Sequence, residues 1–166
     1  MKVKTLTTNG IIAALYVAVT FLIAPFGFTL IQFRISEIFN HLVVFNKKYI
    51  FGIVVGVFSA NLLFSPVAVD IIFGVLHSVI ALSITIFSAK FIKGIFKRML
   101  FNTIVFTLTM VIIAFQLSFF ADIPEFNGLP FLIIYLTLAI GEFVVMAIGI
   151  PIIHALNKRL NFEKLI

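Results

Sequence analysis

The sequence predicts an all-α membrane protein with six transmembrane helices. Composition is the first reason. Of the 166 residues, 63% are hydrophobic and 11% are charged, whereas soluble domains are about 45–50% apolar and about 25% charged. The other reasons are the spacing of the apolar segments and the position of the basic residues between them. The length suits one domain, so we expect residues 1–166 to form a single integral membrane unit.

Six apolar segments define the expected helices. A helix needs roughly 20 apolar residues to cross the bilayer. The second segment is short, since its residues rise only about 16 Å as an α-helix, and it carries Glu37, Asn40 and His41. It therefore crosses only if its flanks also lie in the membrane region. The segments are approximately Thr8–Ala24, Ile35–Phe45, Tyr49–Phe64, Val67–Phe91, Leu100–Phe120 and Leu129–Leu156.

Basic residues indicate that the short segment counts as a crossing. They occupy the two ends of the chain and alternate connections, so six crossings place eleven of the 12 on one side of the membrane. The positive-inside rule then puts both termini in the cytoplasm. The loop Ala121–Gly128, with Asp122 and Glu125, falls outside, and Arg34 is the remaining basic residue. The eleven are Lys2, Lys4, Lys47, Lys48, Lys90, Lys93, Lys97, Arg98, Lys158, Arg159 and Lys164.

Polar residues within the apolar segments are the candidate binding groups. Ionisable residues in a membrane span are costly and usually face the interior of the helix bundle. Estimated depths place them in an outer and a middle layer and leave the inner third of each span almost without polar groups. This distribution predicts a cavity open to the outside. The alternative is structural, for example an ion pair of Arg34 with Glu37 or Asp70. The candidates are Arg34, Glu37, Asn61, Asp70, His77, Gln116 and Glu142.

Small residues recur every fourth position on two of the expected helices. One set is Gly10, Ala14 and Ala18, and the other is Gly52, Gly56 and Ala60. This spacing lets helix backbones approach closely. We expect one set to pack inside the chain and the other to pack against an external helix.

Several functions lack their sequence signatures. The chain has no cysteine, which excludes disulfides and a cysteine nucleophile. It has no G-x-x-x-x-G-K-[ST] loop for ATP, and neither H-E-x-x-H, G-x-S-x-G nor a metal-ligand spacing. We therefore expect no catalytic residues, no metal and no cofactor bound by this chain. Its basic residues lie between the apolar segments, so they indicate membrane topology and not a nucleic-acid-binding surface.

Four short motifs resemble the QueT family, whose members are substrate-binding S components of energy-coupling factor (ECF) transporters. They are IQFRISE (31–37), GVFSAN (56–61), VDIIFG (69–74) and AIGE (139–142). The first is fairly specific, and the others gain weight from their order and spacing. The resemblance covers nearly the whole chain.

The resemblance implies a function and partners. S components are six-helix proteins of the bacterial cell membrane that capture a micronutrient from outside. They pair with a transmembrane T component and two cytoplasmic ATPases, which use ATP and Mg. An alanine motif on the first helix contacts the T component, and the matching residues are Ala14 and Ala18. The implied transport movement is a toppling of the S component within the membrane.

QueT proteins are assigned to queuosine precursors, which are 7-deazaguanines. Such a ring has an edge with several N–H donors, and a carboxylate accepts two of them side by side. Glu142 and Asp70 are the candidate carboxylates. We expect Asn61, Gln116 and His77 to make other contacts with the edge of the ring. Arg34 and Glu37 could form a lid over it. Two alternatives remain: an S component for hydroxymethylpyrimidine or pyridoxine, and a stand-alone proton-coupled carrier.

Overall fold

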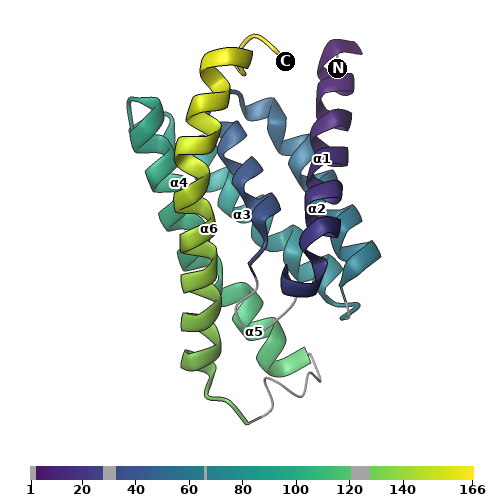
Figure 1. The fold of residues 1–166 in the computed structure, drawn as a ribbon. Helices are drawn as coiled ribbons and strands as arrows, with labels where there is room; N and C mark the ends of the chain where they lie inside the picture. The colour runs from purple at the N-terminus through teal and green to yellow at the C-terminus, as the bar shows by residue number, and fades with distance from the viewer. Residues whose placement is uncertain (1–2, 28–32, 66, 121–127) are drawn as a thin grey trace.

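The computed structural model describes residues 3–27, 33–65, 67–120 and 128–166, and all its regular elements are helices. Figure 1 shows an elongated bundle in which successive elements run up and down the long axis. Side chains of residues 24–27 lie outside the description, as do Lys2, Asp122 and Glu125. The elements are α1 (Val3–Gly27), the 3₁₀ helices η1 (Ile35–Val44) and η2 (Lys47–Tyr49), α2 (Ile50–Phe64), α3 (Asp70–Ser88), α4 (Ile95–Thr109), α5 (Val111–Phe120) and α6 (Phe131–Leu160).

Five stretches of helix are long and apolar enough to cross a membrane. They correspond to five of the six predicted segments: Val3–Ile23, Lys47–Phe64, Asp70–Ser88, Ile95–Phe120 and Phe131–Leu160. The fourth stretch contains both α4 and α5, which meet at Met110. Just before this junction the Thr109 hydroxyl donates to the carbonyls of Val105 and Phe106. Such bonds from threonine to the preceding turn tend to bend helices.

The second predicted segment differs from the prediction of a transmembrane α-helix. It forms η1, a 3₁₀ helix of ten residues, which at about 2 Å per residue is still shorter than the hydrocarbon core of about 30 Å. Most of its residues are buried, and it packs against α1, α2, α3, α4 and α6. It lies inside the bundle in Figure 1. Its short length and its polar residues are therefore surrounded by protein, where non-helical and polar groups are tolerated at membrane depth.

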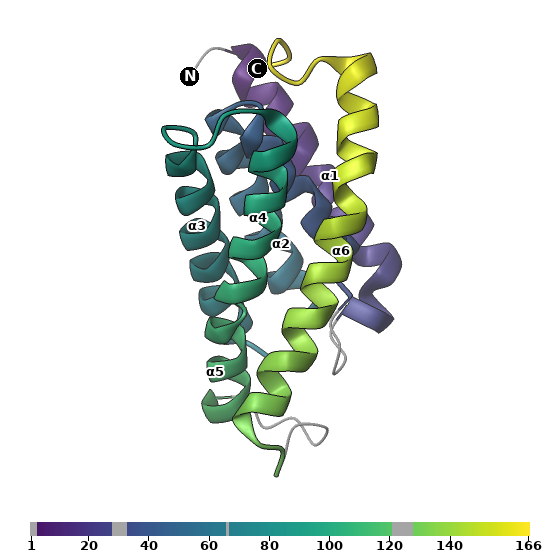
Figure 2. The same cartoon turned by 90° about the vertical axis from the view of Figure 1, so that its left-hand side faces the viewer.

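The two termini lie at the same end of the bundle in both views (Figures 1 and 2). Hydrogen bonds connect four segments of the chain at this end. The Lys4 ammonium donates to the Lys164 carbonyl at 2.6 Å, and the Tyr49 hydroxyl donates to the Phe162 carbonyl at 2.9 Å. Arg98 at the start of α4 donates to the carbonyl of Val44 at 2.6 Å. The basic clusters near these residues thus share one end, as the charge pattern predicts.

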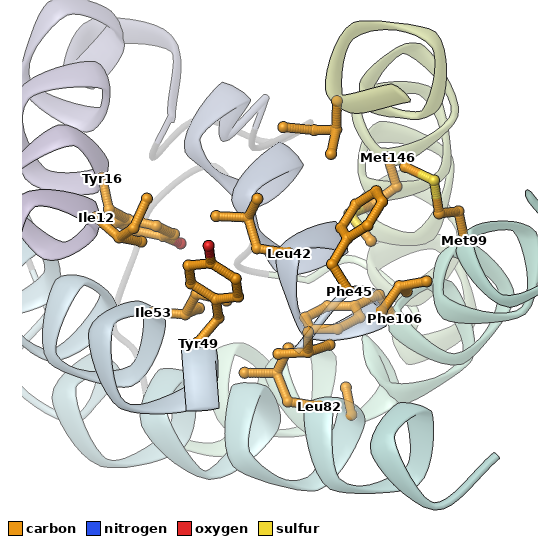
Figure 3. Close-up of a cluster of buried hydrophobic side chains, with 14 of the residues drawn as sticks. Ile12, Tyr16, Leu42, Phe45, Tyr49, Ile53, Leu82, Met99, Phe106 and Met146 are labelled. Carbon is orange, nitrogen blue, oxygen red and sulfur yellow. The ribbon is translucent and has the colours of Figure 1, made fainter. Parts of the chain in front are cut away.

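A continuous apolar core joins this end to the middle of the bundle. Figure 3 shows Tyr16 pointing from α1 toward Leu42 of η1, with Tyr49 and Ile53 beside them and Phe106 beyond. α1 and α2 pack closely, because a Cβ added at Gly56 would lie 2.7 Å from the Cβ of Tyr16. The backbones can approach this closely only because α2 presents glycine there.

Candidate ligand-binding site

Glu142 of α6 is the most unusual side chain of the described bundle. It is 1% exposed, and neither of its carboxylate oxygens has a hydrogen-bond partner among the residues that the structure describes. Its neighbours Leu138 and Met146, one turn away on either side, are both 0% exposed, so helical periodicity places Glu142 on the inward face. Buried polar atoms without partners are rare in proteins because each one carries a desolvation penalty. Glu142 is thus a buried carboxyl group whose hydrogen-bonding capacity is not used by the described residues.

Gln116 of α5 has the same property. It is 0% exposed, and in the described part of the chain neither its amide nitrogen nor its amide oxygen has a hydrogen-bond partner. Its neighbours Ile113 and Leu117 belong to the apolar cluster that joins α5 to α6. The side chain therefore presents one donor group and one acceptor in an otherwise apolar part of the bundle.

Glu37 of η1, in contrast, is fully engaged with protein. One carboxylate oxygen accepts the Tyr16 hydroxyl at 2.7 Å, and the other accepts the Asn40 side-chain amide. The Asn40 amide oxygen has no hydrogen-bond partner among the described residues. Tyr16 and Asn40 are not among the site residues that the sequence predicts. The 3₁₀ turn of η1 stacks positions i and i+3, which favours the bond between Glu37 and Asn40.

Residues from four elements lie within electrostatic range of one another. The charges of Glu37 and Arg34 both act on the Glu142 carboxylate. The Arg34 charge also acts on His77 of α3 and on Tyr16 of α1. Arg34 is the residue immediately before η1. The predicted candidates Arg34, Glu37, His77 and Glu142 therefore converge in the folded chain.

His77 is held against α4. It is 3% exposed, its Nε2 lies 3.4 Å from the Phe106 carbonyl oxygen, and its ring meets the Phe106 ring edge-on at 5.3 Å. The imidazole therefore lies next to a buried aromatic face.

Asn61 and Asp70 form a separate contact between α2 and α3. The Asn61 amide donates to the Asp70 carbonyl oxygen at 3.0 Å, and the Ser65 hydroxyl donates to the Asp70 carboxylate. A Cβ at Gly74 would lie 2.2 Å from the Asn61 amide nitrogen. These contacts join the two helices at the turn between them, and they show how Gly74 makes room for Asn61.

A second polar network lies nearer the end that holds the termini. The prediction that the inner third of the spans has almost no polar groups is therefore wrong. Asn102 donates to Nδ1 of His41 at 3.2 Å and accepts from the Thr85 hydroxyl at 2.6 Å. Nε2 of His41 then donates to the Met146 carbonyl at 2.9 Å. Every group named here has a partner, so this network joins η1, α3, α4 and α6 without leaving an atom for a ligand.

The two sets of small residues have opposite orientations. On α2, Gly52, Gly56 and Ala60 are buried, whereas Gly10, Ala14 and Ala18 on α1 are exposed. Beside them is a shallow groove of about 460 Å³ between α1 and α2, lined by Ala13, Ala14, Val17, Ala18, Phe21, Ser59 and Phe64. The α2 set therefore serves packing inside the chain, and the α1 set forms an open face.

Comparison with known proteins gives one family. The model of the QueT transporter family matches residues 6–158. The queuosine precursor transporter QueT of Lactococcus lactis subsp. cremoris (strain MG1363) is 35% identical over 172 aligned positions, which cover 98% of each chain. No solved structure matches.

Proposed function

The chain belongs to the QueT transporter family, and we propose that it captures a queuosine precursor, a 7-deazaguanine, from outside a bacterial cell. In this proposal it is the S component of an ECF transporter. It crosses the membrane six times with both termini in the cytoplasm, and η1 forms the second crossing. It is a transporter subunit and not an enzyme.

The observation that carries the proposal is Glu142. A 7-deazaguanine offers a ring N–H and an exocyclic amino group side by side, and a carboxylate accepts both with charge-assisted strength. Both oxygens of Glu142 are open for such a pair. The Gln116 amide supplies a donor for the ring carbonyl, and Phe106 beside His77 supplies an aromatic wall.

The other predicted residues have supporting roles in this proposal. Arg34 and Glu37 close the site from the start of η1, where their charges act on Glu142. Asn61 and Asp70 hold the turn between α2 and α3 through their bond to each other. His77 contributes its edge next to Phe106.

Energy for uptake comes from partners in this proposal. The sequence has no P-loop, so a T component and two ATPases using ATP and Mg supply the driving force. The exposed Ala14 and Ala18 face is the surface that we assign to the T component.

Direct binding to the purified chain tests the proposal. Isothermal titration with 7-deazaguanine precursors, hydroxymethylpyrimidine and pyridoxine should give submicromolar affinity for the 7-deazaguanines alone. Tight binding of a different ring would overturn the substrate assignment. Concentrative uptake by the chain alone in proteoliposomes with a proton gradient would identify a stand-alone carrier and overturn the subunit assignment.

A further inference from the structure

Asn40 carries an open hydrogen-bond acceptor that the sequence motifs do not indicate. The residue is 0% exposed, and its Oδ1 has no partner among the described residues. Its Nδ2 is engaged with Glu37. One end of this buried amide is therefore anchored, and the other end is free.

The chemistry of the Glu37 carboxylate determines which end is free. An ionised carboxylate only accepts hydrogen bonds. If the Asn40 amide were turned over, its oxygen would face the Glu37 oxygen and the two acceptors would repel. The nitrogen must therefore point to Glu37, and the oxygen must point away from it.

Tyr16 fixes the carboxylate in turn. Its hydroxyl donates to Glu37 at 2.7 Å from a different element, α1, and its ring is 2% exposed within the apolar core. Figure 3 shows Tyr16 pointing from α1 into the bundle. Hydrogen bonds from Tyr16 to Glu37 and from Asn40 to Glu37 thus fix the orientation of the Asn40 side chain relative to α1.

Buried oxygens without a hydrogen-bond partner in the described part of the chain lie on three elements. They are both oxygens of Glu142 on α6, the Gln116 oxygen on α5 and the Asn40 oxygen on η1, and the buried nitrogens in the same state are the Gln116 amide nitrogen and Arg98 Nε near the termini. Because η1 packs against α6, a ligand that bonds both Glu142 and Asn40 would present N–H donors on more than one side of its ring. The Glu142 pair alone accounts for only one edge.

We propose that Asn40 is a specificity-determining residue whose Oδ1 accepts a hydrogen bond from an N–H of the ligand that Glu142 does not contact. Glu37 and Tyr16 are positioning residues that act through Asn40. This inference rests on the proposed function, and it narrows the ligand to heterocycles with N–H donors on two separate edges. It also gives Glu37 an indirect role instead of a direct contact.

The test uses the full chain and a set of 7-deazaguanine analogues. Each analogue lacks one N–H, through loss of the exocyclic amine or replacement of a ring N–H by oxygen or CH. Affinities are measured for the wild type and for Asn40→Ala, Tyr16→Phe and Tyr49→Phe. Tyr49→Phe is the matched control, because its hydroxyl also makes one buried bond, to the Phe162 carbonyl near the termini.

For the wild type, removing the N–H read by Asn40 should weaken binding on the order of tenfold. In Asn40→Ala the affinity for the parent compound should fall by the same factor. The analogue that lacks this N–H should then bind Asn40→Ala as tightly as it binds the wild type, because the variant and the analogue remove the same contact. Tyr16→Phe should reduce the contribution of the same N–H, and Tyr49→Phe should leave every ratio unchanged. A purely structural role would lower all affinities together.

Two failures are distinguishable. If the folded wild type binds none of the compounds, the proposed function is wrong. If it binds them, but removing each N–H lowers the affinity by the same factor in the wild type, in Asn40→Ala and in Tyr16→Phe, the inference about Asn40 is overturned. The proposed function then still stands. Should Asn40→Ala not fold, Tyr16→Phe decides alone, because it removes one oxygen and keeps the packed ring.

Discussion

At the scale of single residues, the site separates polar groups that hold the fold from polar groups that have open atoms. Glu37, Asn61 and Asp70 each have protein partners, whereas Glu142 and Gln116 have none among the described residues. Sequence alone treats all five alike, because all are polar residues in apolar segments. Only the folded contacts distinguish them, and the distinction leads to opposite expectations on mutation.

Glu142→Met should stabilise the ligand-free protein and abolish tight ligand binding. A buried polar group without partners costs about 1–3 kcal/mol, and more when it is charged, so replacing it with an apolar side chain of similar length should raise the free energy of unfolding by about that amount. Thermal unfolding in detergent, together with titration of a 7-deazaguanine precursor, measures both effects.

The control is Glu163→Gln, since Glu163 is exposed near the C-terminus. It should change neither quantity. If Glu142→Met lowered the stability of the ligand-free protein, Glu142 would have a structural partner, and its assignment to the ligand would fail.

At the scale of elements, the contact between α1 and α2 depends on missing side chains. A Cβ at Gly52 would lie 2.7 Å from the backbone oxygen of Asn9, and the Asn9 side chain also accepts the Gly52 amide N–H at 2.8 Å. Backbone atoms cannot move aside as a flexible side chain does. Gly10, on the open face of α1, has nothing within 4 Å of such a Cβ.

Gly52→Ala should therefore destabilise the protein, and Gly10→Ala should not. Overpacking a well-packed contact costs about 1–3 kcal/mol, whereas alanine in an open helical position gains up to about 1 kcal/mol over glycine. Melting temperatures of the two variants in the same detergent give the comparison. Equal stability of both variants would show that α1 and α2 approach less closely than described.

The sequence predicts six apolar segments, and five of them form helices long enough to span a membrane. Hydropathy identifies these five because each is apolar over enough length, but it does not predict their detailed form. It misses the 3₁₀ geometry of η1, which depends on burial against five other helices. Depth estimates identify Glu142 and Gln116, since they use position along the chain. They miss Tyr16 and Asn40, because the direction in which a residue points depends on tertiary packing.

At the scale of the whole molecule, the described bundle has an open face of small residues on α1, which the proposed function assigns to the T component. Ala14 and Ala18 are exposed on α1 beside a groove of about 460 Å³. Ridges of small residues associate helices in membranes by allowing close backbone contact. Glu142 and Gln116 lie on α6 and α5, so the proposed partner face and the proposed ligand site are on different helices.

Replacing both Ala14 and Ala18 with leucine should block transport and leave ligand affinity within a few-fold of the wild type, because the added side chains fill the face without touching the site. Uptake by cells that carry the whole transporter, together with titration of the purified chain, separates the two quantities. Ser83→Leu, at an exposed position of α3, is the matched control and should transport normally. Normal transport by the double variant would remove this face from the partner interface.

The buried tyrosine hydroxyls have a consequence for how the molecule sits in a bilayer. Tryptophan and tyrosine usually stabilise the depth and tilt of a membrane protein by lying at its two interfaces. This chain has no tryptophan, and the hydroxyls of Tyr16 and Tyr49 bond to internal groups. Apart from Arg34, the described basic residues cluster toward the end that holds the termini. The remaining tyrosine, Tyr135, is half-buried near the start of α6. We therefore expect lipid headgroups to hold the protein mainly at the end with the termini, and tilting to be less restrained at the opposite end.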